Sequence, residues 1–123
     1  MAKYVDGFVI VMPEKNLGDY KKMAKLGAKV WKKCGALDYK ECVSEDIRSK
    51  SMGMAPLFPK MTNLKKGEVV VFSYIVFKSR KHRDQVNAKV MNDPLMAPEN
   101  FKGPMPFDPK RVAYGGFEVL VEG

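Results

Sequence analysis

The stretch that most constrains the fold is residues 68–77, EVVVFSYIVF, which is the longest run dense in β-branched and aromatic residues. Read as a strand, it is apolar on both faces, one formed by Val69, Val71, Ile75 and Phe77 and the other by Val70, Phe72, Tyr74 and Val76. A strand with one face in water alternates apolar and polar residues, so this one is expected to be covered on both sides. Its valine content, directly after Gly67, favours a strand over a helix.

Length and composition predict a single domain spanning residues 1–123. The chain has 46% hydrophobic residues, enough to bury a core. No apolar run approaches the ~20 residues of a membrane helix, and Asp6 and Gly7 interrupt the N-terminus before a signal-peptide core develops. Cys34 and Cys42 have neither CxxC spacing nor histidine partners, so we expect reduced thiols. These features predict a cytoplasmic protein with no membrane partner.

The order of predicted elements indicates an α+β fold. Strands are predicted at 4–12, 36–44, 68–77 and 111–121, and helices at 17–34 and 80–92. Asn16 and Ser79 are the predicted N-caps, and Gly35 closes the first helix. The order β-α-β-β-α-β is that of a ferredoxin-like sandwich, in which the first and third strands are central. Those two strands are the most apolar here, whereas the more polar strand 36–44 suits a sheet edge.

The second face of the sheet also needs a cover. Helices of a ferredoxin-like sandwich protect one face only, so the simplest cover is the same face of a second copy, which gives a two-fold dimer of the dimeric α/β barrel type. The long connections 45–67 and 95–109 are rich in methionine, phenylalanine and proline, as is typical of lids and interface arms. The alternative is a monomer whose connections fold over its own sheet.

Asp6 is the predicted catalytic residue. Small and branched residues such as Gly7 and Val9 suit a face packed on helices, so by elimination the Asp6 face is expected to point toward the second layer. A carboxylate in an enclosed space has a shifted pKa and can abstract a proton. The alternative is a structural salt bridge or a backbone-bonded carboxylate at a strand end, since a buried carboxylate needs a partner.

Other polar side chains are predicted to share that space. The ligand-binding candidates are Tyr4, Tyr74, Arg83, Arg111 and Tyr114. The arginines would neutralise Asp6 or bind an acidic ligand, and Tyr114 could instead serve dimer packing. The pair Gly115-Gly116 inside the last strand predicts a bulge or the close approach of another backbone.

The sequence has no pattern for a metal or cofactor. Its single histidine, His82, lies among basic residues of a predicted helix, where a surface position is expected. A metal site or a haem needs clustered or axial ligands that the chain lacks. It also has no phosphate-binding glycine loop or nucleophile elbow. We therefore predict no metal and no cofactor.

The net charge of +8 raises the question of an anionic partner. Lysines gather on helix 17–34 at positions 21, 22, 25, 29, 32 and 33. Tyr20 and Trp31 fall on its apolar stripe, so these lysines are not interleaved with aromatic residues. The interpretation we prefer is a solvated helix face, and the alternative is an RNA-binding surface.

Several motifs resemble the YbaA-like family of uncharacterised bacterial proteins. They are YVDGF at 4–8, VVFS at 70–73, NAKVM at 87–91 with Asp93-Pro94, and MPFD at 105–108 followed by Arg111 and YGGFE at 114–118. The similarity runs nearly end to end and implies the dimeric α/β barrel superfamily. Relatives there include cofactor-free monooxygenases, haem-degrading enzymes and stress-responsive barrels, so the fold alone selects no function.

Three functions therefore stay open. The first is a homodimer whose inter-sheet cavity holds a small, mostly apolar molecule. The second is a purely structural or interaction dimer with a filled interior, and the third is the RNA-binding module. The sequence does not decide whether the protein is an enzyme.

Overall fold

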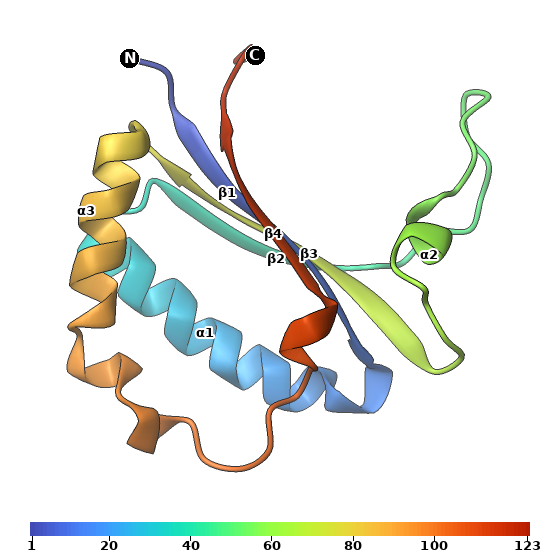
Figure 1. Ribbon diagram of the computed structural model, residues 1–123, viewed down its shortest axis with the longest axis horizontal. Coiled ribbons are helices and arrows are strands. Elements are labelled where there is room, and N and C mark those ends of the chain that lie inside the picture. Colours follow the sequence, from blue (N-terminus) through green and yellow to red (C-terminus); the bar gives the residue numbers. More distant parts are fainter.

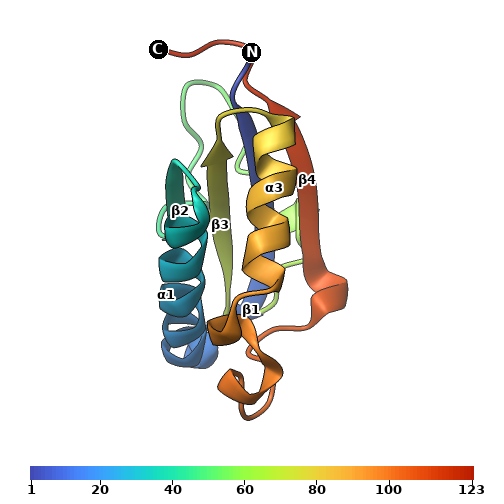
Figure 2. The ribbon, with the colours of Figure 1, turned by 90° about the vertical axis from the view of Figure 1, so that its left-hand side faces the viewer.

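The computed structural model describes residues 1–123 as a mixed α+β fold with a four-stranded sheet and two long helices. The elements are β1 (Tyr4–Pro13), α1 (Leu17–Cys34), β2 (Asp38–Val43), α2 (Phe58–Met61), β3 (Glu68–Phe77), α3 (Arg80–Met91) and β4 (Val112–Glu118), with short 3-10 turns at Glu14–Asn16, Pro94–Met96, Pro98–Asn100 and Pro109–Arg111. Helices α1 and α3 lie on the same face of the sheet (Figures 1 and 2). None of the helices combines the length and the hydropathy needed to cross a membrane.

The sheet has the strand order β2-β3-β1-β4, and every neighbouring pair is antiparallel. The apolar strands β1 and β3 are central, as predicted, and β2 lies at an edge. Strand β4 pairs with β1 without interruption through Gly115 and Gly116, so the predicted bulge is absent. The close approach at these glycines comes from the rings of Phe117 and Tyr4 rather than from another backbone.

The predicted helices are confirmed to within one residue, because their ends are set locally. Gly35 ends α1 with a φ of 119°, which few residues other than glycine adopt without strain. The Ser79 hydroxyl accepts a hydrogen bond from the His82 backbone N–H (3.1 Å) and caps α3. Asn16 occupies the N-cap position of α1, but its side-chain amide donates instead to the Pro106 carbonyl (2.9 Å).

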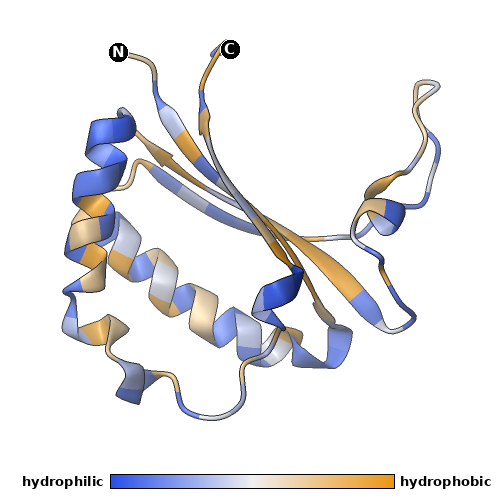
Figure 3. Ribbon diagram, in the orientation of Figure 1, coloured by the Kyte–Doolittle hydropathy of each residue, from blue (hydrophilic) through white to orange (hydrophobic).

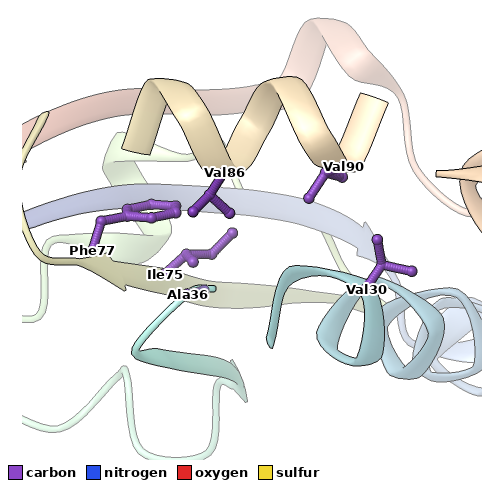
Figure 4. Close-up of a cluster of buried hydrophobic side chains, with 6 residues drawn as sticks. All are labelled: Val30, Ala36, Ile75, Phe77, Val86 and Val90. Atoms are coloured by element: carbon purple, nitrogen blue, oxygen red, sulfur yellow. The ribbon is translucent and has the colours of Figure 1, made fainter. Parts of the chain in front are cut away.

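The core fills the space between the sheet and the two helices. One cluster consists of Val30, Ala36, Ile75, Phe77, Val86 and Val90. Figure 4 shows Val86 and Val90 of α3 directed toward the side where Ile75 and Phe77 leave β3. A second cluster, formed by Ile10, Met12, Tyr20 and Val71, lies beside α1.

The predicted facing of β1 is wrong. Ile10 and Met12 pack with Tyr20 of α1, and Asp6 bonds to Arg83 of α3, so the Asp6 face lies on the helix side. Val9 and the other odd-numbered residues of β1 lie on the opposite side. The physical reason is distance, since layers about 10 Å apart need long side chains to fill the gap. Asp6 tolerates burial there because a helix supplies its cation.

The connection between β2 and β3 projects on the side of the sheet away from the long helices (Figure 1). We call residues 45–67 the arm. The Arg111 guanidinium secures it by donating to the backbone carbonyls of Thr62 (3.3 Å) and Asn63 (3.0 Å) and by pairing with Glu68. The arm covers only one end of the face opposite α1 and α3, and the rest of that face stays open.

Candidate functional site

The side of the sheet opposite α1 and α3, which we call the open face, is apolar at its centre. It carries Val5, Val9, Phe72, Tyr74, Val76, Ala113 and Phe117, with Cys42 on the edge strand. Phe72 of the central strand β3 is 46% exposed and Phe117 of the edge strand β4 is 59% exposed, which is unusual for large apolar side chains. Figure 3 shows the hydrophobic stretch of β3 running on toward the arm.

Glycines flatten part of the open face so that a ring can lie on it. Gly7 pairs with Gly115 across β1 and β4, and the Phe117 ring lies over both. A Cβ at either position would come within 3.3 Å of that ring. The glycines therefore allow Phe117 to lie along the sheet and to widen its apolar surface.

Charge is nearly absent from the open face. The exceptions are Asp38 and Lys40, which pair with each other at the β2 edge. The polar groups left near the centre are the Tyr74 hydroxyl and the thiol of Cys42, which is free and exposed. Such a surface suits contact with another apolar surface or with an apolar molecule.

Four of the six predicted site residues meet on the helix side of the sheet, where β1, β4 and α3 converge. Arg83 Nη1 lies 2.7 Å from Asp6 Oδ1 and 2.8 Å from the Tyr114 hydroxyl, which in turn donates to Asp6 Oδ1 (3.2 Å). The Arg83 guanidinium also stacks 4.9 Å from the centre of the Tyr4 ring. The Asp6 side chain is only 3% exposed and that of Arg83 12% exposed.

This cluster has the geometry of a structural ion pair. Burial alone would lower the pKa of Arg83, but the hydrogen bond to Asp84 and the charge of Asp6 outweigh it and raise that pKa. Burial, followed by the Asp6 charge, raises the pKa of Tyr114, so its hydroxyl stays protonated. Asp6 therefore faces the helix layer with its cation in place, and its predicted position in a second-layer cavity is wrong.

The other two predicted residues lie elsewhere and do not contact Asp6. Tyr74 is on the open face, paired with Gly7 and next to Phe72, whose ring centre is 6.2 Å away. Arg111 holds the arm. Its bond with Glu68 raises its own pKa and lowers the pKa of Glu68. The six candidates thus belong to three separate places.

His82 has a structural role close to the surface. Its Nδ1 accepts a hydrogen bond from the Lys78 backbone N–H (3.0 Å), and its ring packs edge-on against Phe77. Burial lowers its pKa, so the ring is held neutral as that acceptor requires. The structure contains no group of three or more residues able to hold a metal ion.

A second polar cluster was missed by sequence reasoning. Tyr20 of α1 and Tyr39 of β2 each donate a hydrogen bond of 2.7 Å to a different carboxylate oxygen of Glu41. Burial, then the bond to Glu41, raises the pKa of both tyrosines, which keeps them protonated as donors. The one sequence feature that could have indicated this cluster is Gly27 on the buried stripe of α1. A glycine is needed there because a Cβ would lie 3.0 Å from the Tyr39 hydroxyl.

The fold and the open face thus define a small α+β protein with one sheet face left uncovered. Over residues 3–109 the chain matches the family described as "Protein of unknown function (DUF1428)". It belongs to that family. It is 40% identical over 120 residues to "Uncharacterized protein YbaA" of Escherichia coli strain K12 and to the protein of the same title from Shigella flexneri, with 98% of each chain covered. The resemblance to the YbaA-like family is confirmed.

Proposed function

We propose that the chain is a ferredoxin-like domain that forms a homodimer through its open face, as a dimeric α/β barrel, and encloses a small, mostly apolar molecule between the two sheets. The observation that carries this proposal is the exposure of Phe72 and Phe117 on the face that α1 and α3 leave uncovered. Large apolar patches on a folded protein mark interaction sites. Burying these rings against a partner sheet stabilises the assembly in proportion to the area removed from water.

The charge distribution favours a second copy as the partner. The chain carries a net charge of +8, so most of its surface repels an identical molecule. The open face is the exception, because its only charged pair, Asp38 and Lys40, is neutralised internally. Two such faces related by a two-fold axis bring together mainly apolar side chains.

The arm supplies further surface for the same contact. It exposes Met52, Met54, Leu57, Phe58 and Met61. It projects on the side that the second copy would occupy (Figure 1). An arm of this kind can close over the edge of the partner sheet, and methionine adapts well to such irregular contacts.

The ligand between the sheets would be small and mostly apolar, because its surroundings are. Tyr74 and Cys42 are the polar groups that each copy would direct toward it. The structural alternative is an interface filled by Phe72 and Phe117 with no ligand. Nothing in this arrangement requires a metal or cofactor, and we propose none.

The RNA-binding alternative has less support. Tyr20 is 6% exposed, and Trp31 packs on the core and donates to Asn87 Oδ1 (3.0 Å), so neither ring of α1 is free to stack on a base. Lys33 is paired with Asp93. The remaining lysines are spread along an exposed helix face, which is the arrangement of a solvated surface.

Sedimentation and native mass spectrometry test the proposal. We expect the wild-type protein to sediment as a dimer and Phe72→Glu as a monomer, because the variant places two carboxylates in the interface. Met91→Glu is the matched control: Met91 is 78% exposed but lies on α3, away from the open face, so this variant should remain dimeric. A wild-type monomer, or a dimeric Phe72→Glu variant, would refute the proposed interface. Extra mass on the native dimer supports a bound ligand, and a bare dimer supports the structural alternative.

A further inference from the structure

A half-open pocket of about 230 Å³, which we call the cavity, lies between the sheet and the helices, on the side away from the open face. Its lining residues include Trp31 of α1, Ser73 of β3 and Phe107 of the connection before β4. Tyr20, Tyr39 and Glu41 border both this cavity and an outer groove of about 460 Å³ between α1 and β2. The cavity is below the ~300–1,000 Å³ of drug-sized sites, so it suits a ligand of only a few heavy atoms.

Glu41 is the only acidic residue that lines the cavity. Each of its oxygens accepts one tyrosine hydroxyl, which fixes the carboxylate and leaves further acceptor positions free. It takes part in none of the salt bridges of the chain, whereas the buried Asp6 has Arg83. A cation that enters the cavity would be attracted to this carboxylate, because no cation of the chain is paired with it.

The remaining lining suits a cation. Five aromatic residues surround the space: Phe8, Tyr20, Trp31, Tyr39 and Phe107. Aromatic faces attract cations, most strongly where water is excluded. Ser73, only 4% exposed, adds a hydroxyl that forms none of the side-chain hydrogen bonds of the chain. Ser73 lines the cavity, so its hydroxyl is the second polar group that we assign to the site.

We propose that this cavity binds a small organic monocation, an alkylammonium group whose N–H donors reach Glu41 and Ser73 and whose alkyl chain lies among the aromatic rings. We assign a single charge because Glu41 is the only acidic residue of the lining, and Lys21 and Lys25 beside the outer groove disfavour each added positive charge. Lys40 is held by Asp38, and the lysines of α1 do not pair with Glu41. The site uses residues of one copy only and does not rest on the proposed dimer.

Gly27 shows that the helix accommodates this cluster. A glycine inside a helix costs about 1 kcal/mol relative to alanine. Here it leaves room for the Tyr39 hydroxyl beside α1. Gly27 therefore acts as a positioning residue, because it allows Tyr39 to reach Glu41.

Trp31 is the only tryptophan of the chain and lines the cavity, so its fluorescence reports on occupancy. The titration uses butylammonium chloride, with butanol and sodium butyrate as neutral and anionic probes of similar shape. We expect a saturable change with butylammonium and at least ~10-fold weaker binding of the other two, as the loss of a charge-assisted bond implies. Equal binding of butanol and butylammonium, or no saturable response, would overturn the assignment.

Substitutions at the lining residues test whether butylammonium binds in this cavity. Glu41→Gln keeps the shape and one acceptor but removes the charge, and should weaken butylammonium binding by at least ~10-fold while leaving butanol unchanged. Ser73→Ala should weaken it by a smaller factor, and the matched control Glu45→Gln, at an exposed loop position, should not. Unaltered binding in folded Glu41→Gln would overturn the proposal. Repeating the titration on Phe72→Glu separates it from dimerisation, because the site predicts equal affinity there whatever the oligomeric state.

Discussion

The two faces of the sheet are built from alternate residues of the same strands, yet their side chains differ in kind. On the helix side, β1 presents a carboxylate, a phenyl ring and long aliphatic chains, each with its own partner on α1 or α3. On the open face the same strand presents only small residues, Val5, Gly7, Val9 and Val11. The helix side needs unlike shapes because it fills a gap against helices within one chain, whereas a uniform flat face can meet a copy of itself.

The two faces also differ in the charged side chains that they carry. The helix side buries Asp6 with Arg83 and half-buries Glu41 between two tyrosines. The centre of the open face has no charged group, although water could have solvated one there. This contrast indicates that the helix side has specific polar sites within each copy and that the open face is kept apolar for contact.

The largest expected effect of a substitution is on the helix side, at Arg83. Arg83→Leu leaves Asp6 buried without a cation, which should destabilise the fold by about 3–5 kcal/mol. Urea unfolding followed by circular dichroism measures the change. Asp84→Asn is the control, because Asp84 binds the same guanidinium but is 60% exposed, so its loss should cost about 0.5 kcal/mol or less. A loss of unfolding free energy below about 1 kcal/mol in Arg83→Leu would mean that the helix side does not depend on its buried ion pair.

Neighbouring residues of β1 give a second comparison, in aliphatic packing. Ile10→Ala empties space in the cluster beside Tyr20 and should cost about 2–5 kcal/mol. Val9→Ala removes methyls from the open face and should cost about 1 kcal/mol or less in the Phe72→Glu background, where no partner covers it. Chemical denaturation of both variants in that background tests this. Equal losses would mean that something within the chain covers the open face.

Local signals accounted for most of the architecture. The bounds of β3 were predicted to the residue, and Ser79 and Gly35 mark helix ends through short-range backbone chemistry. The facing of β1 was wrong, because alternation separates two faces without saying which one meets helices. For Asp6, the deciding contact is Arg83, which lies far away in sequence.

The candidate sites depended on such distant contacts even more. Arg111 or Arg83 was predicted to neutralise Asp6, since a buried carboxylate needs a partner, and the structure pairs Asp6 with Arg83. Glu41 was taken for an ordinary polar residue of an edge strand. Its meeting with Tyr20 depends on how α1 lies across β2, and periodicity within a single element does not contain that information.

Adjacent glycines of β4 provide a third and smaller test. A Cβ at Gly116 would collide with the Tyr4 ring, which stacks on Arg83 on the helix side, so Gly116→Ala should cost about 1–2 kcal/mol. At Gly115 the nearest atoms belong to the exposed Phe117 ring, which can move aside, so Gly115→Ala should change stability by about 0.5 kcal/mol or less. Thermal unfolding of the two variants measures these changes in stability. The opposite order would show that Phe117 is held more firmly than Tyr4.

The smallest effect concerns the arm and depends on pH. The hydrogen bond from Arg111 is the main reason that the pKa of Glu68 is lowered, so folding favours the ionised carboxylate. Its stabilisation is therefore complete above the usual glutamate pKa and is lost as the pH falls through the lowered pKa of the folded state. The pair is partly exposed, so we expect about 1 kcal/mol or less. The difference in Tm between wild type and Glu68→Gln should be constant near neutral pH and vanish in acid. In Arg111→Gln the part due to the ion pair should vanish in the same way, and the part that persists in acid measures the bonds from Arg111 to the Thr62 and Asn63 carbonyls. A Glu68→Gln difference that persists in acid would contradict the role of the ion pair.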